Sequence, residues 1–306
     1  MNDGMLSGYF SGYEIVGTQN HNIEAYNGAD IASIGYFVAP QEATHALISA
    51  CACGRDGDYL EFIDPETYYG STAAGGGGAA CYRVSFELSV YRYVPYVIGA
   101  YPAGVKIGAN AGTDLVSGPV YGGFPTIILN DGGSVQDFVN GGNGGGATWG
   151  YQNSNTSIVS ITASGGAGGS GAKGGSGKVV VLYDGGIISG GSGGGGSNAD
   201  GGNLHTPFGL RRGGTRYATQ GTGGGGASFY ADGIGGYYDY TTSYVNTAQI
   251  IGVRSNLDLF TGGYHYSVPG AGMPGRVTAV DDDTGYNTYR STRFIYCEFI
   301  APRGSP

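Results

Sequence analysis

The segment Gly165–Gly177 constrains the fold of this chain more than any other stretch. Glycine occupies positions 165, 168, 171, 174 and 177, a strict period of three. A helix repeats every ~3.6 residues and a strand every ~2. A period of three fits an extended helix of the polyproline II type, which rises about 3.1 Å per residue without internal hydrogen bonds. Such a helix needs glycine, because a Cβ would block the close approach of neighbouring backbones.

Glycine tracts recur along the chain and account for much of its composition. Glycine is 65 of the 306 residues, far above ordinary usage. A flexible Gly/Ser linker is the simplest alternative for any single tract. Repeated tracts between apolar segments instead favour an ordered layer, which we expect to be a bundle of short polyglycine II helices. The tracts are residues 73–80, 141–150, 165–177, 185–202, 223–236 and 270–275.

The segments between the tracts have the patterns of β-strands. Residues 81–90 alternate clearly, which predicts the even-numbered side chains from Tyr82 to Val90 on one face. Residues 45–53 form a continuous apolar run, typical of a strand covered on both faces. Residues 293–301 are expected to pair inside the sheet that begins the domain, with Glu298 on a face that reaches water. Further strands are predicted at residues 36–40, 93–98, 126–129, 157–163, 178–183 and 249–254.

Together these patterns predict an all-β protein. We expect an antiparallel β-sandwich combined with the polyglycine bundle and almost no α-helix, apart from a short helix beginning at Asp64-Pro65. Residues 1–36 are an N-terminal segment, either an edge strand pair or an attachment segment. Residues 37–306 are the glycine-rich domain with tyrosine-rich loops.

Charge and cysteine usage exclude several classes of function. The chain has 14 basic and 23 acidic residues, which disfavours nucleic acid as a partner. No apolar run approaches the ~20 residues of a membrane helix, and no signal peptide is recognisable at the N-terminus. The cysteines lie in apolar runs and are expected to be buried thiols, with a metal site or disulfide as the alternative. We expect no metal and no cofactor.

Catalytic motifs give little support for an enzyme. Residues 169–174 match G-x-G-x-x-G, but a strand-like segment follows where the dinucleotide motif needs a helix. Acidic residues cluster at 61–66 (Glu61, Asp64, Glu66) and at 281–283. A glycosidase needs two carboxyl groups ~5–9.5 Å apart, whereas a helix cap and a solvated turn are the simpler interpretations. We therefore expect a protein that is not an enzyme.

Tyrosine-rich segments between glycine tracts are the best candidates for binding. Tyrosine offers rigid, amphipathic contact area at low entropic cost. The alternative is that these tyrosines pack against the glycine layer, an alternative slightly favoured for Tyr264. The candidate receptor-binding residues are Tyr237, Tyr238, Tyr240, Tyr244, Tyr264, His265 and Tyr266.

The order of these segments resembles the glycine-rich domain of bacteriophage tail proteins. The resemblance rests on YFVAP (36–40), HALISACAC (45–53), GGGGAACYRVSFELSV (75–90), the repeated GG blocks and the closing strand RFIYCEFI (293–300). The glycine layer is also similar to that of phage tail-fibre tip adhesins, in which glycine helices carry receptor-binding loops. The longer tyrosine-rich inserts of this chain depart from the pattern.

The resemblance implies a structural virion protein, a tail-fibre or tail-tip adhesin that presents loops to the host surface. The expected partners are other virion proteins and a bacterial surface glycan or outer-membrane protein, and by analogy with fibres the assembly would be a homotrimer. A capsid or tail decoration protein without a receptor is the first alternative, and a polysaccharide-degrading enzyme is the second. An ice-binding protein is disfavoured, because no flat repeating Ala/Thr face accompanies the glycines.

Overall fold

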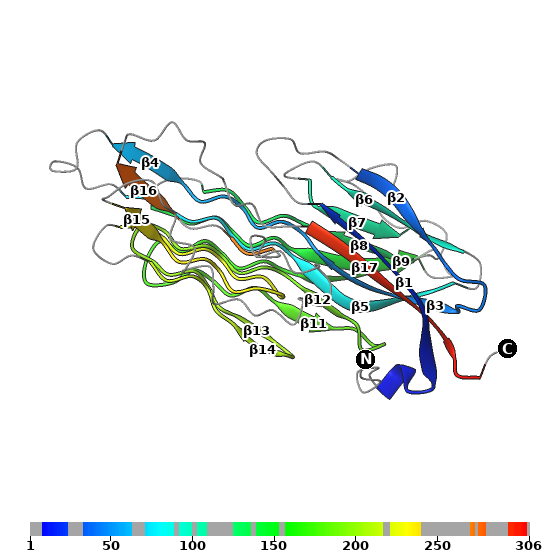
Figure 1. Cartoon of the computed structure of the whole chain (residues 1–306). Helices are drawn as coiled ribbons and strands as arrows, with labels where there is room; N and C mark the ends of the chain where they lie inside the picture. Colours follow the sequence, from blue (N-terminus) through cyan, green and yellow to red (C-terminus); the bar gives the residue numbers. More distant parts are fainter. Residues whose placement is uncertain are drawn as a thin grey trace.

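The computed structural model describes residues 8–23, 33–62, 71–88, 92–99, 103–108, 125–135, 139–152, 157–216, 221–239, 270–272, 275–279 and 293–304. Within these ranges the protein is all-β, with antiparallel sheets stacked as a sandwich, as predicted (Figure 1). The described helical structure is a short 3₁₀ turn at Gly8–Phe10. The predicted helix at Asp64 and the predicted strand at 249–254 lie outside the described residues.

The described residues form seventeen strands. They are β1 (Tyr13–Ile23), β2 (Ser33–Val38), β3 (His45–Cys51), β4 (Tyr59–Phe62), β5 (Ala80–Glu87), β6 (Tyr93–Ile98), β7 (Val105–Gly108), β8 (Thr126–Leu129), β9 (Ala147–Gln152), β10 (Ile158–Ala163), β11 (Val179–Val181), β12 (Ile187–Ser189), β13 (Leu204–Thr206), β14 (Gly209–Arg211), β15 (Tyr237–Asp239), β16 (Arg276–Ala279) and β17 (Arg293–Pro302).

Two antiparallel sheets form the sandwich. One has the strand order β1-β17-β3-β5-β12-β11 and the other β10-β9-β8-β7-β6-β2. β17 lies between β1 and β3, which confirms that the terminal apolar strand pairs inside the sheet that begins the domain. Within residues 1–36, β1 and the first part of β2 lie at the edges of different sheets, where they pair with β17 and β6 and not with each other. The domain boundary predicted at residue 36 falls inside β2.

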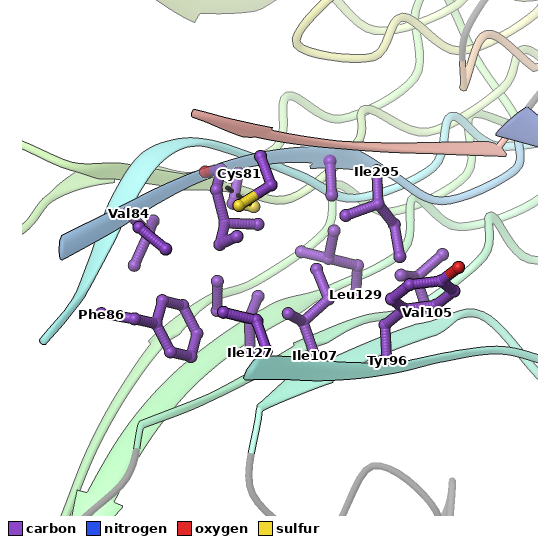
Figure 2. Packing of buried hydrophobic residues seen from close by; sticks show 14 of the residues in the cluster. Cys81, Val84, Phe86, Tyr96, Val105, Ile107, Ile127, Leu129 and Ile295 are labelled. Atoms are coloured by element: carbon purple, nitrogen blue, oxygen red, sulfur yellow. Dashed lines mark hydrogen bonds between the residues drawn. The ribbon is translucent and has the colours of Figure 1, made fainter. Parts of the chain in front are cut away.

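The hydrophobic core lies between the two sheets. Val84, Phe86 and Ile295 from the first sheet meet Ile107 and Ile127 from the second, and all five are buried (Figure 2). β3 is buried along nearly its whole length, as its continuous apolar run predicts. Burial of this apolar area is the main stabilising term for the sandwich.

The predicted alternation of β5 holds only after a bulge at Arg83. Val84, Phe86 and Leu88 face the core as expected, but the buried residue before them is Cys81, while Tyr82 packs in a second cluster. Arg83 has a positive φ of 46°, and the register with β3 shifts between Ile48 and Ala50. A bulge adds one residue to a strand, so the side chains before it change faces.

Glu298 is 7% exposed, and its face of β17 reaches water at the half-buried Tyr296. Its carboxylate accepts two hydrogen bonds of 2.7 Å from the Arg83 guanidinium. The bulge therefore supplies the cation that replaces solvent at Glu298.

The glycine tracts continue from the sandwich strands and lie side by side, away from both described chain ends (Figure 1). Short strands overlap two predicted tracts: Ala147–Gln152 begins inside tract 141–150 and runs past its end, and Ile187–Ser189 lies inside tract 185–202. We call the following set the glycine layer: residues 52–58, 72–79, 130–133, 141–146, 164–178, 190–203, 212–216, 221–227, 231–236, 270–272 and 275.

Residues 72–79 lie inside the glycine layer and make hydrogen bonds that repeat every three residues. The amides of Ala74 and Gly77 donate to the carbonyls of Gly195 and Ser192 at 2.8 and 2.9 Å. Successive residues bond to different neighbouring segments, and the residue three positions further along bonds again to the same segment. Among the described residues, the segments bonded to this tract are 52–58, 130–133, 142–145, 192–195, 221–226 and Gly270.

Glycine is required where these backbones touch. A Cβ added to Gly77 would lie 2.2 Å from the carbonyl oxygen of Ala227, and one added to Gly191 would lie 2.0 Å from that of Gly77. Those neighbours are backbone atoms and cannot rotate away as a side chain could. In contrast, a Cβ on the exposed Gly171 would meet nothing within 4 Å.

A buried ion pair joins the sandwich to the glycine layer. Arg293 and Asp131 are each 1% exposed in their side chains and lie 3.1 Å apart. Asp131 also accepts from the amides of Cys53 and Gly104, at 2.7 and 3.1 Å, while Arg293 donates to the carbonyl of Gly99 at 3.0 Å. Burial raises the pKa of Asp131, and Arg293 and the two amides oppose that shift.

We predict opposite outcomes for two glycine-to-alanine substitutions. Gly77→Ala should lower the free energy of unfolding by about 3 kcal/mol, because the layer must open to admit the methyl group. Gly171→Ala should leave stability unchanged or raise it by up to about 1 kcal/mol, because alanine restricts the unfolded chain. Urea denaturation of both variants measures the difference. Equal stabilities would contradict the close packing of the layer.

Candidate binding end of the glycine layer

The end of the glycine layer farthest from the sandwich carries a small parallel sheet (Figure 1). Its strand order is β15-β16-β4. Each strand continues a segment of the layer that runs away from the sandwich, which is why the three are parallel. Their last described residues are therefore at the same edge of this sheet: Phe62, Asp239 and Ala279.

The sequence-predicted binding residues are only partly within the described chain. Tyr237 and Tyr238 lie in β15. The register places Tyr237 beside Arg276, which in turn pairs with Tyr59. The other candidate binding residues lie outside the described residues: Tyr240, Tyr244, Tyr264, His265 and Tyr266.

Sequence reasoning did not find β4 or β16 as partners of the tyrosine-bearing strand. The β-branched pair Val277-Thr278 was the available signal for β16. For β4 the alternation of Leu60, Glu61 and Phe62 was equally short. Strands of four residues separated by more than two hundred positions cannot be paired from local patterns alone.

The candidate carboxylates are also divided between described and undescribed parts. Glu61 lies in β4, where the register places it beside Thr278, which pairs with Asp239. Asp64, Glu66 and residues 281–283 lie outside the described residues. Within the described chain, no cluster of three or more His, Cys, Asp or Glu side chains is arranged to hold a metal ion.

The four cysteines are free and buried, which confirms the interpretation from their apolar surroundings. The Cys81 thiol lies 3.7 Å from the carbonyl oxygen of Ile48. Burial raises the pKa of Cys81 to about 12, and burial also raises the pKa of Cys51 and Cys297 well above that of a free thiol. A thiol that stays protonated at neutral pH is a poor nucleophile and metal ligand.

Neither the comparison with protein-family models nor the comparison with curated proteins finds a match for this chain. In the part of the chain that the structure describes, none of the helical structure has the length and apolar character needed to span a bilayer.

The raised thiol pKa values predict that the fold weakens in alkali. A thiol with a higher pKa in the folded than in the unfolded state stabilises the fold fully below its unfolded pKa. For Cys81 that contribution is lost as the pH rises from about 9 towards about 12. At pH 10 the loss from Cys81 alone should be roughly 1 kcal/mol. Urea denaturation at pH 7.5, 9 and 10 measures it.

Cys81→Ala is the control for this prediction, because it removes one titrating group from the core. Its free energy of unfolding should fall less between pH 7.5 and pH 10 than that of the unaltered protein. A stability that does not change over this interval would contradict the assignment of buried, protonated thiols.

Proposed function

We propose that this chain is a structural protein of a bacteriophage virion, a tail-fibre or tail-tip adhesin that presents tyrosine-bearing segments to the host surface. One observation carries the proposal. The glycine layer separates the sandwich from the small sheet that contains Tyr237 and Tyr238 (Figure 1). The sandwich is then the attachment end and the small sheet the display end.

We further propose that the tracts of the layer are polyglycine II helices. The hydrogen bonds that return to the same neighbour every three residues support this, because a helix of that type has three residues per turn. A bundle cross-linked in several directions resists bending, whereas an isolated glycine tract would be a flexible coil. The layer would therefore act as a stiff spacer that holds the display end away from the virion.

The position of the display end supports this proposal. The chain leaves the described structure after Asp239, at the same edge of the sheet as Phe62 and Ala279. The candidate tyrosines Tyr240 and Tyr244 follow directly in the sequence. Variable segments mounted on a rigid scaffold are a common arrangement for recognition, and tyrosine is well suited to a receptor-contacting surface. The receptor would be a surface glycan or an outer-membrane protein.

Competition with phage adsorption tests the adhesin role. Purified protein should block adsorption of the phage that encodes it, and Tyr240→Ser with Tyr244→Ser should require at least about tenfold more protein for the same block. The matched control is Tyr36→Ser with Tyr183→Ser, since these side chains are 65% and 72% exposed but belong to the sandwich end. The control should block as well as the unaltered protein.

Several results would count against the proposal. Absence of the protein from mass spectra of purified virions would exclude a virion component. If the protein is present but blocks nothing, the decoration role would replace the adhesin role. If the tip variant blocks as well as the control, the tyrosine-bearing tip would not be the surface that contacts the receptor. Release of reducing ends from host capsule would instead support the enzyme alternative.

A further inference from the structure

Positive charge is concentrated in one part of an acidic chain. The whole protein carries a formal net charge of −9, yet residues 164–216, all of which are described, contain five basic and two acidic residues. The acidic ones are Asp184, which is 2% exposed, and Asp200. The basic ones are Lys173, Lys178, Arg211, Arg212 and Arg216.

Adjacent tracts of the glycine layer carry these basic residues. The amide of Gly174 donates to the carbonyl of Asp200 at 2.6 Å, and Gly201 donates to Gly214 at 2.8 Å. Three segments therefore lie next to one another in the layer, in the order 172–178, 200–203 and 212–216. They are on the side of β11, β13 and β14 (Figure 1).

The same contacts fix the level of each cation along the tracts. The backbones of Lys173 and Asp200 form an isolated parallel β-bridge, and the amide of Arg216 donates to the Asp200 carboxylate at 2.8 Å. Lys173 and Arg216 therefore lie at the same position along the tracts. Lys178 lies five residues further along the tract, about 15 Å away at ~3.1 Å per residue. Arg212 is displaced from Arg216 in the same direction, because the amide of Gly213 donates to the side chain of Asn203.

These cations are available to solvent. Lys173, Lys178, Arg212 and Arg216 are exposed, and none of them forms a salt bridge with a carboxylate among the described residues. The nearby carboxylates of Asp200 and Asp232 instead accept hydrogen bonds from the backbone amides of Arg216 and Arg212, respectively. We call the surface of Lys173, Lys178, Arg212 and Arg216 the basic face.

We propose that the basic face binds an acidic polysaccharide. The spacing of the cations decides between polyanions. Duplex DNA carries one negative charge per about 1.7 Å of axis, far denser than cations about 15 Å apart, and the remaining acidic surface of the protein would repel it. A polysaccharide with at most one carboxylate or phosphate per sugar has sparser charges than duplex DNA and comes closer to this spacing.

Small polar and apolar groups complete a surface suited to sugars. Ser176 and Thr215 are exposed beside the cations and offer hydroxyl groups for hydrogen bonding. The β13–β14 hairpin presents Phe208 and Leu210, 48% and 42% exposed. The Phe208 ring is held edge-on against Tyr82, with centroids 4.9 Å apart. Such a fixed aromatic ring can pack against the apolar face of a sugar.

This binding does not depend on the tip of the molecule, so its test needs neither virions nor host cells. Affinity electrophoresis in gels containing alginate, a carboxylated polysaccharide, should retard the purified protein, and retardation should weaken as salt is added. Lys173→Gln with Lys178→Gln should weaken binding at least about tenfold. The matched control is Arg92→Gln with Arg303→Gln, which removes the same charge from exposed positions on the sandwich and should leave binding unchanged.

A second pair of substitutions protects the test against misfolding. Lys178→Gln with Arg212→Gln should give a similar loss, and all variants should keep the melting temperature of the unaltered protein. The proposal would be overturned by no retardation by alginate, by equal weakening by the control pair, or by retardation by duplex DNA as strong as that by alginate. Retardation by neutral dextran as strong as that by alginate would also overturn it, because charge would then play no part.

Discussion

Hydrogen bonding between backbones that carry no side chains is the constraint on which the rest of this structure depends. A buried amide or carbonyl without a partner costs roughly 1–3 kcal/mol, and the glycine layer buries many of both. Each tract satisfies its groups only through its neighbours, as Gly77 does with Ser192 and with Gly145. Glycine also loses more backbone entropy on ordering than any other residue. The layer is therefore stable only as a cooperative unit attached to a body with its own hydrophobic core.

The attachment between the two parts is a specific structure. Asp131 and Arg293 lie where β8 leaves the sandwich and β17 enters it. Through Cys53, Gly99 and Gly104 the pair reaches both sheets at the points where strands end or begin. A buried pair has a large desolvation penalty, and it often adds little net stability. Its value here is positional, since it fixes the spacing of the strands from which the tracts emerge.

Much of the sandwich could be predicted from local pattern, because burial on one face leaves a period of two in the sequence. Residues 93–98 and 126–129 coincide with β6 and β8. The bulge at Arg83 could not be predicted, since arginine rarely adopts a positive φ and the compensating partner, Glu298, is more than two hundred residues away. The strand Ile187–Ser189 escaped detection because glycine tracts flank it on both sides.

The candidate binding surfaces were less accessible to sequence reasoning for the same reason. Tyr237 and Tyr238 were identifiable from composition, but their alignment with β16 and β4 depends on tracts that run in parallel through the layer. The basic face joins Lys173 to Arg216 through the intervening Asp200, and no continuous basic run marks it in the sequence. The glycine period predicted that backbones would pack. It could not show which tracts would be neighbours.

Amide hydrogen exchange tests the ordered layer most directly. Gly77, Gly191 and Gly194 donate to carbonyls of neighbouring tracts at 2.8–2.9 Å. Their amides should therefore exchange at least about a thousandfold more slowly than in an unstructured peptide, approaching the rate set by global unfolding. Exchange of these three amides at the rate of an unstructured peptide would show that the glycine tracts are not packed together, and would contradict the account.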